Sequence, residues 1–324
     1  ERKSNGAQFV KFDLHIHTPA SYDFVMDKSK SEEENYVSLI NDAIDEDIRL
    51  IAITDHNTFN GYNKLKTYIE NRIRNKEKKY TAITILCGIE ITCFSKHLLA
   101  VFPSDFEKKK QDKFLEEIGI EVCCPEAKVS AEIYGPVKLM GIVNKYGGFT
   151  LLPHANSSNG FLQGMYKRKS EEEFQFQGSS LLNIMQSSNL LGIQINDLNA
   201  RETLTKKLKE ATEYKDLDKA FLSFSDCHGN KDSQGKYLSK TGAYIGQSFS
   251  WMKVSEINFN SLKMALVNYR THISDDLLSY EYPYIIGCMI DSDILKSDNG
   301  EEKFFIKFHP EMNCIIGGRG TGKS

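Results

Sequence analysis

The sequence predicts an α/β fold in which strands and helices build a barrel, and three observations support this prediction. Strand-like and helix-like segments alternate along most of the 324 residues, a pattern typical of parallel sheets. Six or more such units follow one another, which favours a barrel. Side chains of the types that bind metals gather where the predicted strands end. In barrels of this kind the catalytic residues lie at the carboxyl ends of the strands.

The first predicted strand, Phe9–His17, has two distinct faces. Alternation would put apolar residues on one face and polar ones on the other, namely Val10, Phe12, Leu14 and Ile16 against Asp13, His15 and His17. Two imidazoles on one face can reach one cation, because neutral imidazole is a good ligand for zinc, iron or manganese. Taken alone, the pair is better explained by chance or by two histidines held by hydrogen bonds in the core.

The remaining elements follow from the spacing of apolar residues. Strands are expected at 50–54, 84–92, 97–102, 149–152, 192–196 and 220–228, and helices at 36–48, 61–79, about 130–146, 203–214 and 255–269. Residues 21–35 are expected to form a polar loop, 105–117 a charged segment and 155–178 an irregular one. The helix over 61–79 has a basic outer face, which includes Arg72 and Arg74.

Most of the histidines lie in or against predicted strands. Of the eight histidines, only His272 and His309 do not. The strand-end residues are His15, His17, Asp55, His56, Glu90, His97, His154, Asp226 and His228. Histidines scattered through a core or over a surface would not collect in this way. Cys227 points away from its two neighbours by alternation, so it is interpreted as a packing residue.

Composition limits the classes of protein that the chain can represent. With 40% hydrophobic and 26% charged residues, it reads as a soluble globular chain, and its net charge of −3 neither favours nor excludes nucleic acid. No apolar run approaches the roughly 18–20 residues that span a bilayer, so no membrane partner is expected. The first residue is Glu1, so no signal peptide can be read and a longer natural N-terminus stays open. Seven cysteines without a CxxC pattern favour a reducing cytoplasm.

Six motifs carry a family resemblance. In order they are DLHIH, TDH, GIE, the histidine of HLLAVF, LLPH and FSDCH, spread over roughly residues 8–275. Together they resemble the PHP (polymerase and histidinol phosphatase) domain. The resemblance implies a distorted (β/α)7 barrel with a two- or three-metal site that cleaves phosphoesters.

The resemblance also implies a set of ligands. His15, His17, Glu90 and Asp226 would hold one metal; Glu90 would bridge to a second, held by His97 and His154; and His56, His228 and Asp23 would hold a third. Many phosphatases of the family have histidine where this chain has Asp23, and a carboxylate shifts preference toward harder ions such as manganese or magnesium. Asp55 would orient a ligand histidine. Two or three ions of manganese, zinc or iron are thus expected, with catalysis carried by Glu90, Asp226 and His17.

Metal ions a few Å apart would polarise a phosphoester and activate water, so no serine or cysteine nucleophile is needed. The segment 155–178 leaves the strand end that carries His154, so it is expected to lie over the site. There Lys167, Arg168 and Lys169 could bind phosphates, with Phe161, Tyr166 and Phe174 stacking on bases. An ordinary solvated insertion, with these cations balanced by Glu171–Glu173, explains the same residues.

The C-terminus carries a second motif. Gly317–Ser324, GGRGTGKS, fits the P-loop pattern, whose phosphate-binding positions would be Gly317, Gly322, Lys323 and Ser324. Expected strands at Phe304–Phe308 and Met312–Ile316 precede it. This end resembles the start of an SMC- or ABC-type ATPase, which would use ATP and Mg²⁺ in the full-length protein. We expect domains at 1–278 and 279–324, with the boundary within 275–284, and no ATP hydrolysis by this chain.

A PHP domain before such an ATPase resembles the TrlF-type PHP–ATPase proteins of bacterial conflict systems. This resemblance implies a nuclease or phosphodiesterase controlled by the ATPase, with nucleic acid as partner, a homo-oligomer formed through the ATPase, and a role in anti-phage defence. A phosphomonoesterase that acts on a small nucleotide or metabolite is the alternative. A barrel that has lost catalysis is a third possibility, against which the near-complete ligand set argues.

Overall fold

The structure is a computed structural model that describes residues 6–121, 134–166, 178–214, 217–232, 234–277, 285–291, 303–309 and 313–314. The chain divides into two compact units. The barrel unit comprises residues 9–276, and the terminal unit combines residues 1–8 with 277–324. All the predicted metal ligands belong to the barrel unit.

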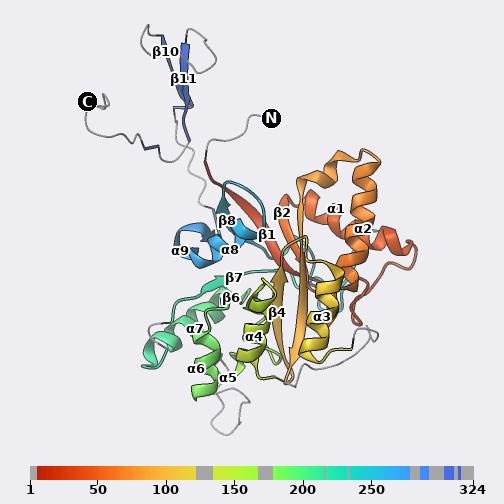
Figure 1. Cartoon of the computed structure of the whole chain (residues 1–324), viewed down its shortest axis with the longest axis vertical. Helices are drawn as coiled ribbons and strands as arrows, with labels where there is room; N and C mark the ends of the chain where they lie inside the picture. The colour runs from red at the N-terminus through yellow and green to blue at the C-terminus, as the bar shows by residue number, and fades with distance from the viewer. Residues whose placement is uncertain are drawn as a thin grey trace. The chain divides into compact units, whose positions relative to one another are not determined.

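The barrel unit is built around one sheet of nine strands, in the order β7-β6-β5-β4-β3-β2-β1-β8-β9 (Figure 1). The strands are β1 (Gln8–Ile16), β2 (Ile48–Ile53), β3 (Thr84–Cys93), β4 (Lys96–Phe102), β5 (Phe149–Leu152), β6 (Leu190–Gln194), β7 (Ala220–Leu222), β8 (Ser250–Val254) and β9 (Ile273–Ser274). Of the strand predicted at 220–228, only the residues of β7 form a continuous ladder with a neighbouring strand. Strand β8 falls where no strand is expected from the sequence.

The two ends of the series β1 to β7 meet at one end of the sheet. A parallel bridge joins Ile16 to Cys227. Beside it the His17 N–H donates to the Cys227 carbonyl at 3.0 Å, and the Asp226 N–H donates to the His15 carbonyl at 2.9 Å. The sheet is therefore a nearly closed barrel, consistent with the PHP barrel that the sequence motifs predict.

The barrel is not uniformly parallel, which corrects the expectation drawn from alternating elements. Strands β1, β2 and β3 pair in parallel, as do β5, β6 and β7, whereas β4 is antiparallel to both of its neighbours. The two-residue turn Phe94–Ser95 joins β3 to β4, and its φ angles of 49° and 62° are typical of tight hairpins. Because the chain reverses so sharply, His97 at the start of β4 pairs with Thr92 near the end of β3.

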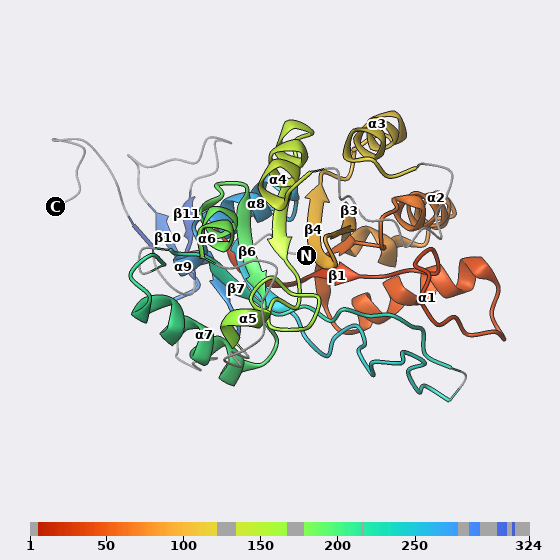
Figure 2. The same ribbon diagram turned by 90° about the horizontal axis from the view of Figure 1, so that it is seen from below.

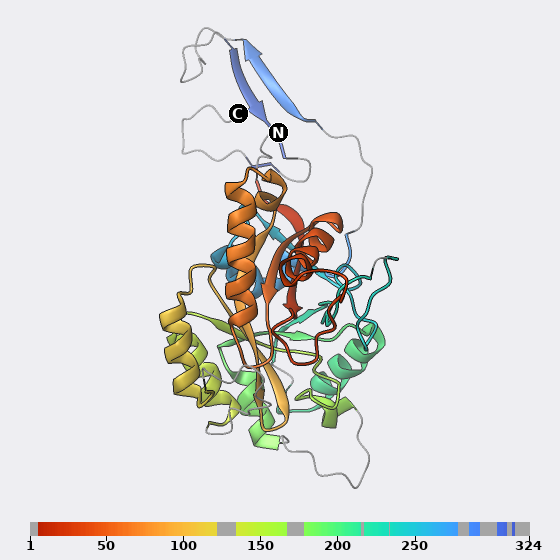
Figure 3. The same ribbon diagram turned by 90° about the vertical axis from the view of Figure 1, so that its right-hand side faces the viewer.

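Helices surround the strands, as the view in Figure 2 shows. They are α1 (Glu32–Asp45), α2 (Asn60–Arg74), α3 (Lys108–Ile118), α4 (Pro136–Lys145), α5 (Gln163–Tyr166), α6 (Gly178–Gln186), α7 (Leu198–Glu210), α8 (Phe259–Val267) and α9 (Tyr269–His272), with the 3-10 helix η1 (Lys78–Ala82) after α2. Helices α1 and α2 lie side by side (Figure 3). Within the described ranges, none of these helices has both the length and the apolarity to cross a membrane.

Helix α1 begins four residues earlier than the sequence analysis predicts. Ser31 and Glu34 form a capping box, in which the Ser31 hydroxyl accepts from the Glu34 N–H and the Glu34 carboxylate accepts from the Ser31 N–H at 2.7 Å. The acidic run Glu32–Glu34 then occupies the first turn, where negative charge is favourable. The expectation of a loop over 21–35 is therefore wrong for its last residues.

Besides the single turn α5, two helices lie where no element is expected from the sequence. Helix α3 occupies the charged segment 105–117, and α6 begins at the end of the segment 155–178. Each buries a narrow apolar stripe at helical spacing, of which Phe114 and Ile118 in α3 and Leu181 and Met185 in α6 are examples. Dense charge or polarity around these stripes hides their period from the sequence.

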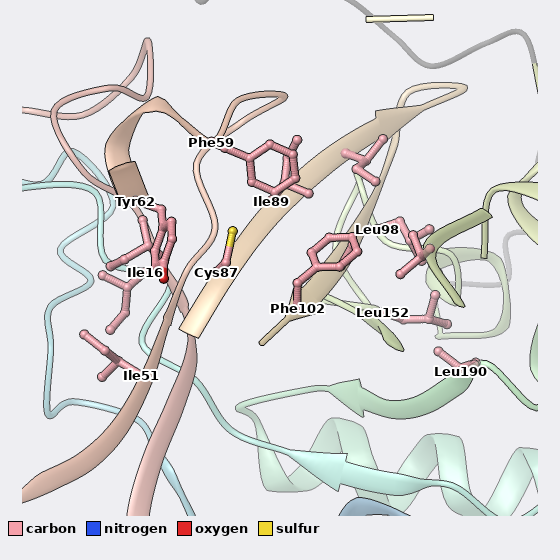
Figure 4. Packing of buried hydrophobic residues seen from close by; sticks show 14 of the residues in the cluster. Ile16, Ile51, Phe59, Tyr62, Cys87, Ile89, Leu98, Phe102, Leu152 and Leu190 are labelled. Carbon is pink, nitrogen blue, oxygen red and sulfur yellow. The ribbon is translucent and has the colours of Figure 1, made fainter. Parts of the chain in front are cut away.

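Two buried clusters cover the two faces of the strands. The interior cluster includes Phe12, Leu14, Leu50, Ala52, Leu86, Leu99, Val101, Leu151, Leu222 and Phe224, and α8 packs against it. The helix-side cluster lies between the strands and the other helices, and it includes Ile16, Ile51, Cys87, Ile89, Phe102 and Leu152 (Figure 4). By alternation along β3 and along the segment after β7, the candidate ligands Glu90 and Asp226 are on the same face of the sheet as the interior cluster. They lie beyond its apolar residues, toward the ends of the strands.

Strand β1 changes face along its length. Phe12 and Leu14 belong to the interior cluster, whereas Ile16 belongs to the helix-side cluster. The pairing register with β2 shifts between Asp13 and Ile16, as an extra residue in one strand produces. Strict alternation, which groups Ile16 with Phe12 and Leu14, is therefore wrong here, and the shift brings His15 onto the interior-facing side.

The described part of the terminal unit contains an antiparallel hairpin of β10 (Gly287–Asp291) and β11 (Lys303–Lys307). Strand β11 overlaps the strand predicted at Phe304–Phe308. The P-loop residues Gly317, Gly322, Lys323 and Ser324 lie outside the described residues, as does most of the strand predicted before them. The ATPase assignment therefore stays a prediction.

Candidate metal centre

The nine side chains predicted as metal ligands come together at one end of the barrel. Their ligand atoms form four overlapping groups, and within each group the atoms lie within 4.8 Å of one another. The groups are His17, Asp23, His56 and His228; His15, Glu90 and His154; His15, His17 and Asp226; and His56, Glu90 and His97. These groups overlap more than the sets implied by the family resemblance, which share only Glu90, because His15, His17, His56 and Glu90 each belong to two groups.

Glu90 occupies the centre of the cluster, and its two carboxylate oxygens face different histidines. Oε1 lies 2.8 Å from His97 Nδ1 and 3.2 Å from His154 Nε2. Oε2 lies 3.1 Å from His56 Nδ1 and 3.3 Å from the Nε2 atoms of both histidines at the end of β1. This side chain is 1% exposed. A carboxylate that bridges two ions requires this arrangement.

Two further acids form the open side of the cluster. Asp226 Oδ1 lies 3.1 Å from His15 Nε2 and 3.5 Å from His17 Nε2. Asp23 Oδ2 lies 3.4 Å from His228 Nε2. The Asp226 and Asp23 side chains are 27% and 33% exposed, whereas those of His15 and His17 are fully buried. A substrate would therefore approach from the side of Asp23 and Asp226.

Gln194, the last residue of β6, links the two halves of the cluster, and the sequence analysis does not identify it. Its Oε1 accepts from His15 Nδ1 at 2.8 Å and from the His154 backbone N–H at 3.3 Å, while its Nε2 donates to the Phe224 carbonyl at 3.3 Å. A ring that donates from Nδ1 keeps Nε2 free for a metal. The available sequence feature was a polar side chain within GIQIN, at the end of an apolar strand.

Two serines have the same role for other rings. Ser21 Oγ lies 2.8 Å from His17 Nδ1 and accepts from the His56 backbone N–H at 3.1 Å. Ser157 Oγ lies 3.0 Å from His154 Nδ1. Each serine follows its histidine by only a few residues. Serine hydroxyls satisfy local partners in so many loops that neither residue stands out in the sequence.

Asp55 organises the chain after His17 instead of contacting a histidine ring directly. Among the hydrogen bonds of the described residues, its carboxylate accepts from the Thr18 backbone N–H at 2.7 Å and from the Thr18 hydroxyl at 2.8 Å. Gly61, in the first turn of α2, packs against this pair, and a Cβ there would lie 1.8 Å from Asp55 Oδ2. Glycine is therefore needed for this approach, and the orienting role predicted for Asp55 is at most indirect.

Two candidate ligands have backbones in the left-handed region. The φ angles are 28° for His154 and 55° for Asp226. Such conformations cost about 1–3 kcal/mol in residues other than glycine and cluster at functional sites. Asp226 is held in place because its N–H donates to the His15 carbonyl at 2.9 Å and its own carbonyl accepts from His228 Nδ1 at 2.8 Å.

The packing of acids against imidazoles shifts the pKa values of both. Burial opposes a charge on His17, but the carboxylates of Asp226 and Glu90 outweigh it and raise the His17 pKa to about 10. Burial likewise opposes the charge on Glu90, yet the surrounding histidines, above all His97, hold its pKa well below the usual range. Burial and the neighbouring His17 lower the pKa of His228 to about 4. Cations in place of the imidazole protons would preserve this charge balance.

Several buried atoms of the cluster have no hydrogen-bond partner within the described part of the chain. They are Asp23 Oδ1, His56 Nδ1, Glu90 Oε2 and Asp226 Oδ1. Atoms are seldom buried in this way unless something else satisfies them. Ligands held about 2.0–2.2 Å from one ion lie roughly 3–3.5 Å apart, which matches the nitrogen–oxygen distances above. Imidazole and carboxylate also suit zinc, iron and manganese. The residues present therefore fit the predicted divalent ions.

The structure gives different outcomes for the other residues that the sequence singles out. Lys167, Arg168 and Lys169 lie outside the described residues. Cys227 is 1% exposed in the helix-side cluster, and burial raises its pKa to about 12, as expected of a packing residue. His272 is half-buried in α9 and contacts Thr271.

The basic face predicted over residues 61–79 is partly neutralised by acids of α1. Lys64 is paired with Glu32. Arg72 lies 2.9 Å from Glu33. These partners lie more than thirty positions away in the sequence, so the charge pattern of the helix alone does not reveal them. Helix α2 is therefore a weaker candidate for a phosphate-binding surface than its sequence indicates.

The sequence matches no protein-family model and no curated protein. The structure is similar to that of Endonuclease Q in complex with a 27-mer duplex substrate that has an abasic lesion at the active site. The TM-score is 0.51 and the identity 12%, over 82% of this chain. The two chains share a fold. This chain spans 58% of the Endonuclease Q chain.

Two further solved structures align with lower TM-scores. A two-domain protein from Bacteroides vulgatus, described as containing a predicted PHP-like metal-dependent phosphoesterase, has a TM-score of 0.44 and 14% identity over 95% of this chain and 86% of its own. PsfC from Pseudomonas syringae has a TM-score of 0.45 and 12% identity over 81% of this chain and 96% of its own.

Proposed function

We propose that this chain is a metal-dependent phosphoesterase that hydrolyses a phosphodiester bond of nucleic acid with water as the nucleophile. The observation that carries the proposal is the convergence of six histidines and three acids at one end of the barrel, with buried ligand atoms that have no hydrogen-bond partner among the described residues. A structural zinc site is closed by four ligands. A cluster of nine exceeds that need and fits two or three ions.

We assign metal binding to all nine residues and the catalytic roles to Glu90, Asp226 and His17. Ions held there would supply Lewis-acid chemistry, because they polarise phosphoryl oxygens and lower the pKa of the attacking water. Glu90 would fix the distance between two ions through its two oxygens. Asp226, on the open side, would orient the water against the phosphate. Manganese, zinc or iron are the candidate ions, and the carboxylate of Asp23 favours the harder ones.

A polymeric substrate is supported by two considerations. The fold is shared with Endonuclease Q, which was solved with a DNA duplex, although this chain spans only part of that protein. The P-loop motif further resembles SMC-type ATPases, which generally act on long polymers. In this proposal Lys167, Arg168 and Lys169, which follow the His154 strand in the sequence, contact the phosphates beside the scissile bond.

A phosphomonoesterase that acts on a small nucleotide or metabolite is the second candidate. The pairing of α2 cations with acids of α1 favours it, because a long polyanion needs a track of cations beyond the site. A small ester needs only the metal cluster and one or two further contacts.

We further propose that the predicted ATPase controls the hydrolase in the full-length protein, within the cytoplasm, and that assembly through the ATPase makes the protein a homo-oligomer. The resemblance to TrlF-type PHP–ATPase proteins supports this part of the proposal and a role in anti-phage defence. Cleavage by this chain alone, compared with a longer chain that includes the ATPase with and without ATP, would test the control.

The test of the main proposal uses the purified chain, manganese, and four substrates: DNA, RNA, tRNA and p-nitrophenyl phosphate. We expect the wild-type chain to cleave a polymer, and we expect a chelator to abolish this cleavage. The Asp226→Asn variant should be inactive, whereas the matched control His272→Ala should cleave as the wild type does. Turnover of p-nitrophenyl phosphate with every polymer intact would favour the small-molecule candidate. No hydrolysis of any ester by a chain with its full complement of metal would overturn the proposal.

A further inference from the structure

Tyr22 places an aromatic ring at the outer edge of the metal cluster. The ring stacks on the imidazole of His56, with centroids 4.9 Å apart and planes inclined at 28°. His56 lies in turn 4.6 Å from the ring of His17. Tyr22 is 49% exposed, whereas His56 is 4% exposed. Tyr22 is therefore the outermost member of a run of rings that begins inside the cluster.

The backbone on both sides of Tyr22 is fixed by the cluster itself. Ser21 precedes it, and its Oγ accepts from the His56 backbone N–H at 3.1 Å. Asp23 follows it, and its Oδ2 lies 3.3 Å from Nε2 of the same histidine. Val25 then donates its N–H at 2.9 Å to a backbone carbonyl of the segment after β7. A ring held in this way loses little conformational freedom when a ligand stacks on it.

Only part of the Tyr22 side chain is used to cover His56. One face covers the imidazole, yet about half of the residue stays in contact with solvent. Tyr22 directly precedes Asp23, one of the two partly exposed acids of the cluster. An aromatic face that is open to solvent beside a backbone-binding site is how proteins hold the bases of single-stranded nucleic acid.

We propose that Tyr22 is the stacking platform for the nucleobase next to the scissile phosphate. This inference rests on the proposed function, because it requires the phosphoester to be held at the metal cluster. It restricts the proposed substrates to phosphoesters in which the nucleotide beside the reacting phosphate has a nucleobase. Every base presents a π face, so such a platform selects nucleotides without discriminating among sequences. An ester of equal charge that lacks the base loses this contact.

The test uses the whole chain and two short phosphodiesters that differ only in one base. One carries 2-aminopurine beside the reacting phosphate, a base whose fluorescence is quenched by stacking, and the other carries an abasic sugar there. We expect Tyr22→Leu to raise KM for the first ester by roughly tenfold, to abolish the quenching on binding, and to leave KM for the abasic ester unchanged. Tyr22→Phe keeps the ring and should retain both wild-type values. Met26→Ala removes an exposed apolar side chain of the same loop and is the matched control.

The outcomes separate the platform from a structural role for the ring. Equal increases in KM for both esters, or loss of metal from Tyr22→Leu in elemental analysis, would show that the ring acts on His56, and the inference would be wrong. Binding of a phosphorothioate analogue is measured in parallel, so the platform can be judged without turnover. Quenching that depends on Tyr22 in a protein without hydrolytic activity would reject the proposed function alone. Hydrolysis without such quenching would reject the platform alone.

Discussion

Charged side chains gather at two places in the barrel unit, along α2 and at the ends of the strands, and their partners differ. On α2, Arg72 lies 2.9 Å from Glu33 of the neighbouring helix. At the strand ends, Glu90 and Asp226 each keep a buried oxygen without a hydrogen-bond partner among the described residues. The α2 cations are therefore paired one by one with acids of α1, whereas the strand-end acids face several imidazoles at once, in an arrangement that fits bound cations.

The energetic scale of the two regions differs as well. Ion pairs on a surface such as that of α2 contribute about 0–1 kcal/mol to the free energy of unfolding. A buried donor or acceptor without a partner costs about 1–3 kcal/mol, and the strained backbones of His154 and Asp226 add to that cost. A region that reduces stability in this way is maintained for what it binds, and substitutions there should affect function far more than substitutions on α2.

The sharpest test of this contrast is removal of the central carboxylate. Glu90→Ala should lower kcat by at least roughly 10²–10³-fold, the loss expected when one preorganised electrostatic group is removed, because the two ions lose their common ligand. Asp226→Ala should come close behind, and His272→Ala should stay near wild type. Activity is compared with the melting temperature of each variant. Equal losses at all three positions would mean that folding is being measured instead of chemistry.

Metal content gives the next largest effect. The purified chain should contain at least two divalent ions, and the double substitution His15→Ala with His17→Ala should remove at least one of them while the barrel stays folded. Elemental analysis measures the ions, and circular dichroism checks the fold. Substoichiometric metal in both proteins, even after manganese or zinc is added, would contradict this comparison, since the clustered imidazoles and carboxylates would then not be metal ligands.

The same region should respond to pH. Burial opposes charge on His15, but Asp226 and Glu90 outweigh it and raise its pKa, as they raise that of His17 to about 10. An imidazole must lose its proton to bind a metal. Protons therefore compete with the ions at every pH below these raised pKa values, and metal affinity should rise between about pH 6 and pH 8. Titration with manganese at several pH values measures this, and an affinity independent of pH would contradict it.

The sequence could predict the cluster because strand ends converge whatever the details of the loops. His154 and Asp226 lie 72 positions apart in a chain whose alternation of strands and helices brings both to one end of the barrel. The register shift in β1 could not be predicted, because an extra residue in a strand leaves no signature in residue types. The start of α1 could have been predicted from Ser31 and Glu34, which form the pattern of a capping box.

The partners of charged residues are the part that the sequence hides. Arg72 meets Glu33 at a separation of 39 positions, and Gln194 meets His15 at 179. Both contacts depend on how elements pack, and neither follows from the local period of apolar residues. For this reason the basic face of α2 looks like a binding surface in the sequence, and the orienting glutamine of β6 looks like an ordinary strand residue.

Gln194 provides a smaller effect that sharpens the comparison, because it acts on the cluster without being a ligand. Gln194→Leu should weaken metal binding by roughly 10–100-fold, as loss of an orienting hydrogen bond typically does, and Gln194→Glu should retain much of the affinity because it keeps an acceptor for His15 Nδ1. Metal affinity by titration is the measurement. Wild-type affinity in Gln194→Leu would show that the His15 ring is oriented by packing alone.

Arg72→Ala should have the smallest effect of all. Because its partner Glu33 is 42% exposed, the ion pair contributes less than about 1 kcal/mol to the free energy of unfolding. Polymer binding and its salt dependence should also stay unchanged, since an arginine already paired with an acid displaces few counterions from phosphates. Charge reversal at Lys167, Arg168 and Lys169 serves as the contrasting variant, and should lower affinity and flatten the salt slope while leaving the metal content intact. A flatter slope for Arg72→Ala would place the nucleic-acid surface on α2 in spite of its ion pairs, and the contrast between the two regions would then be wrong.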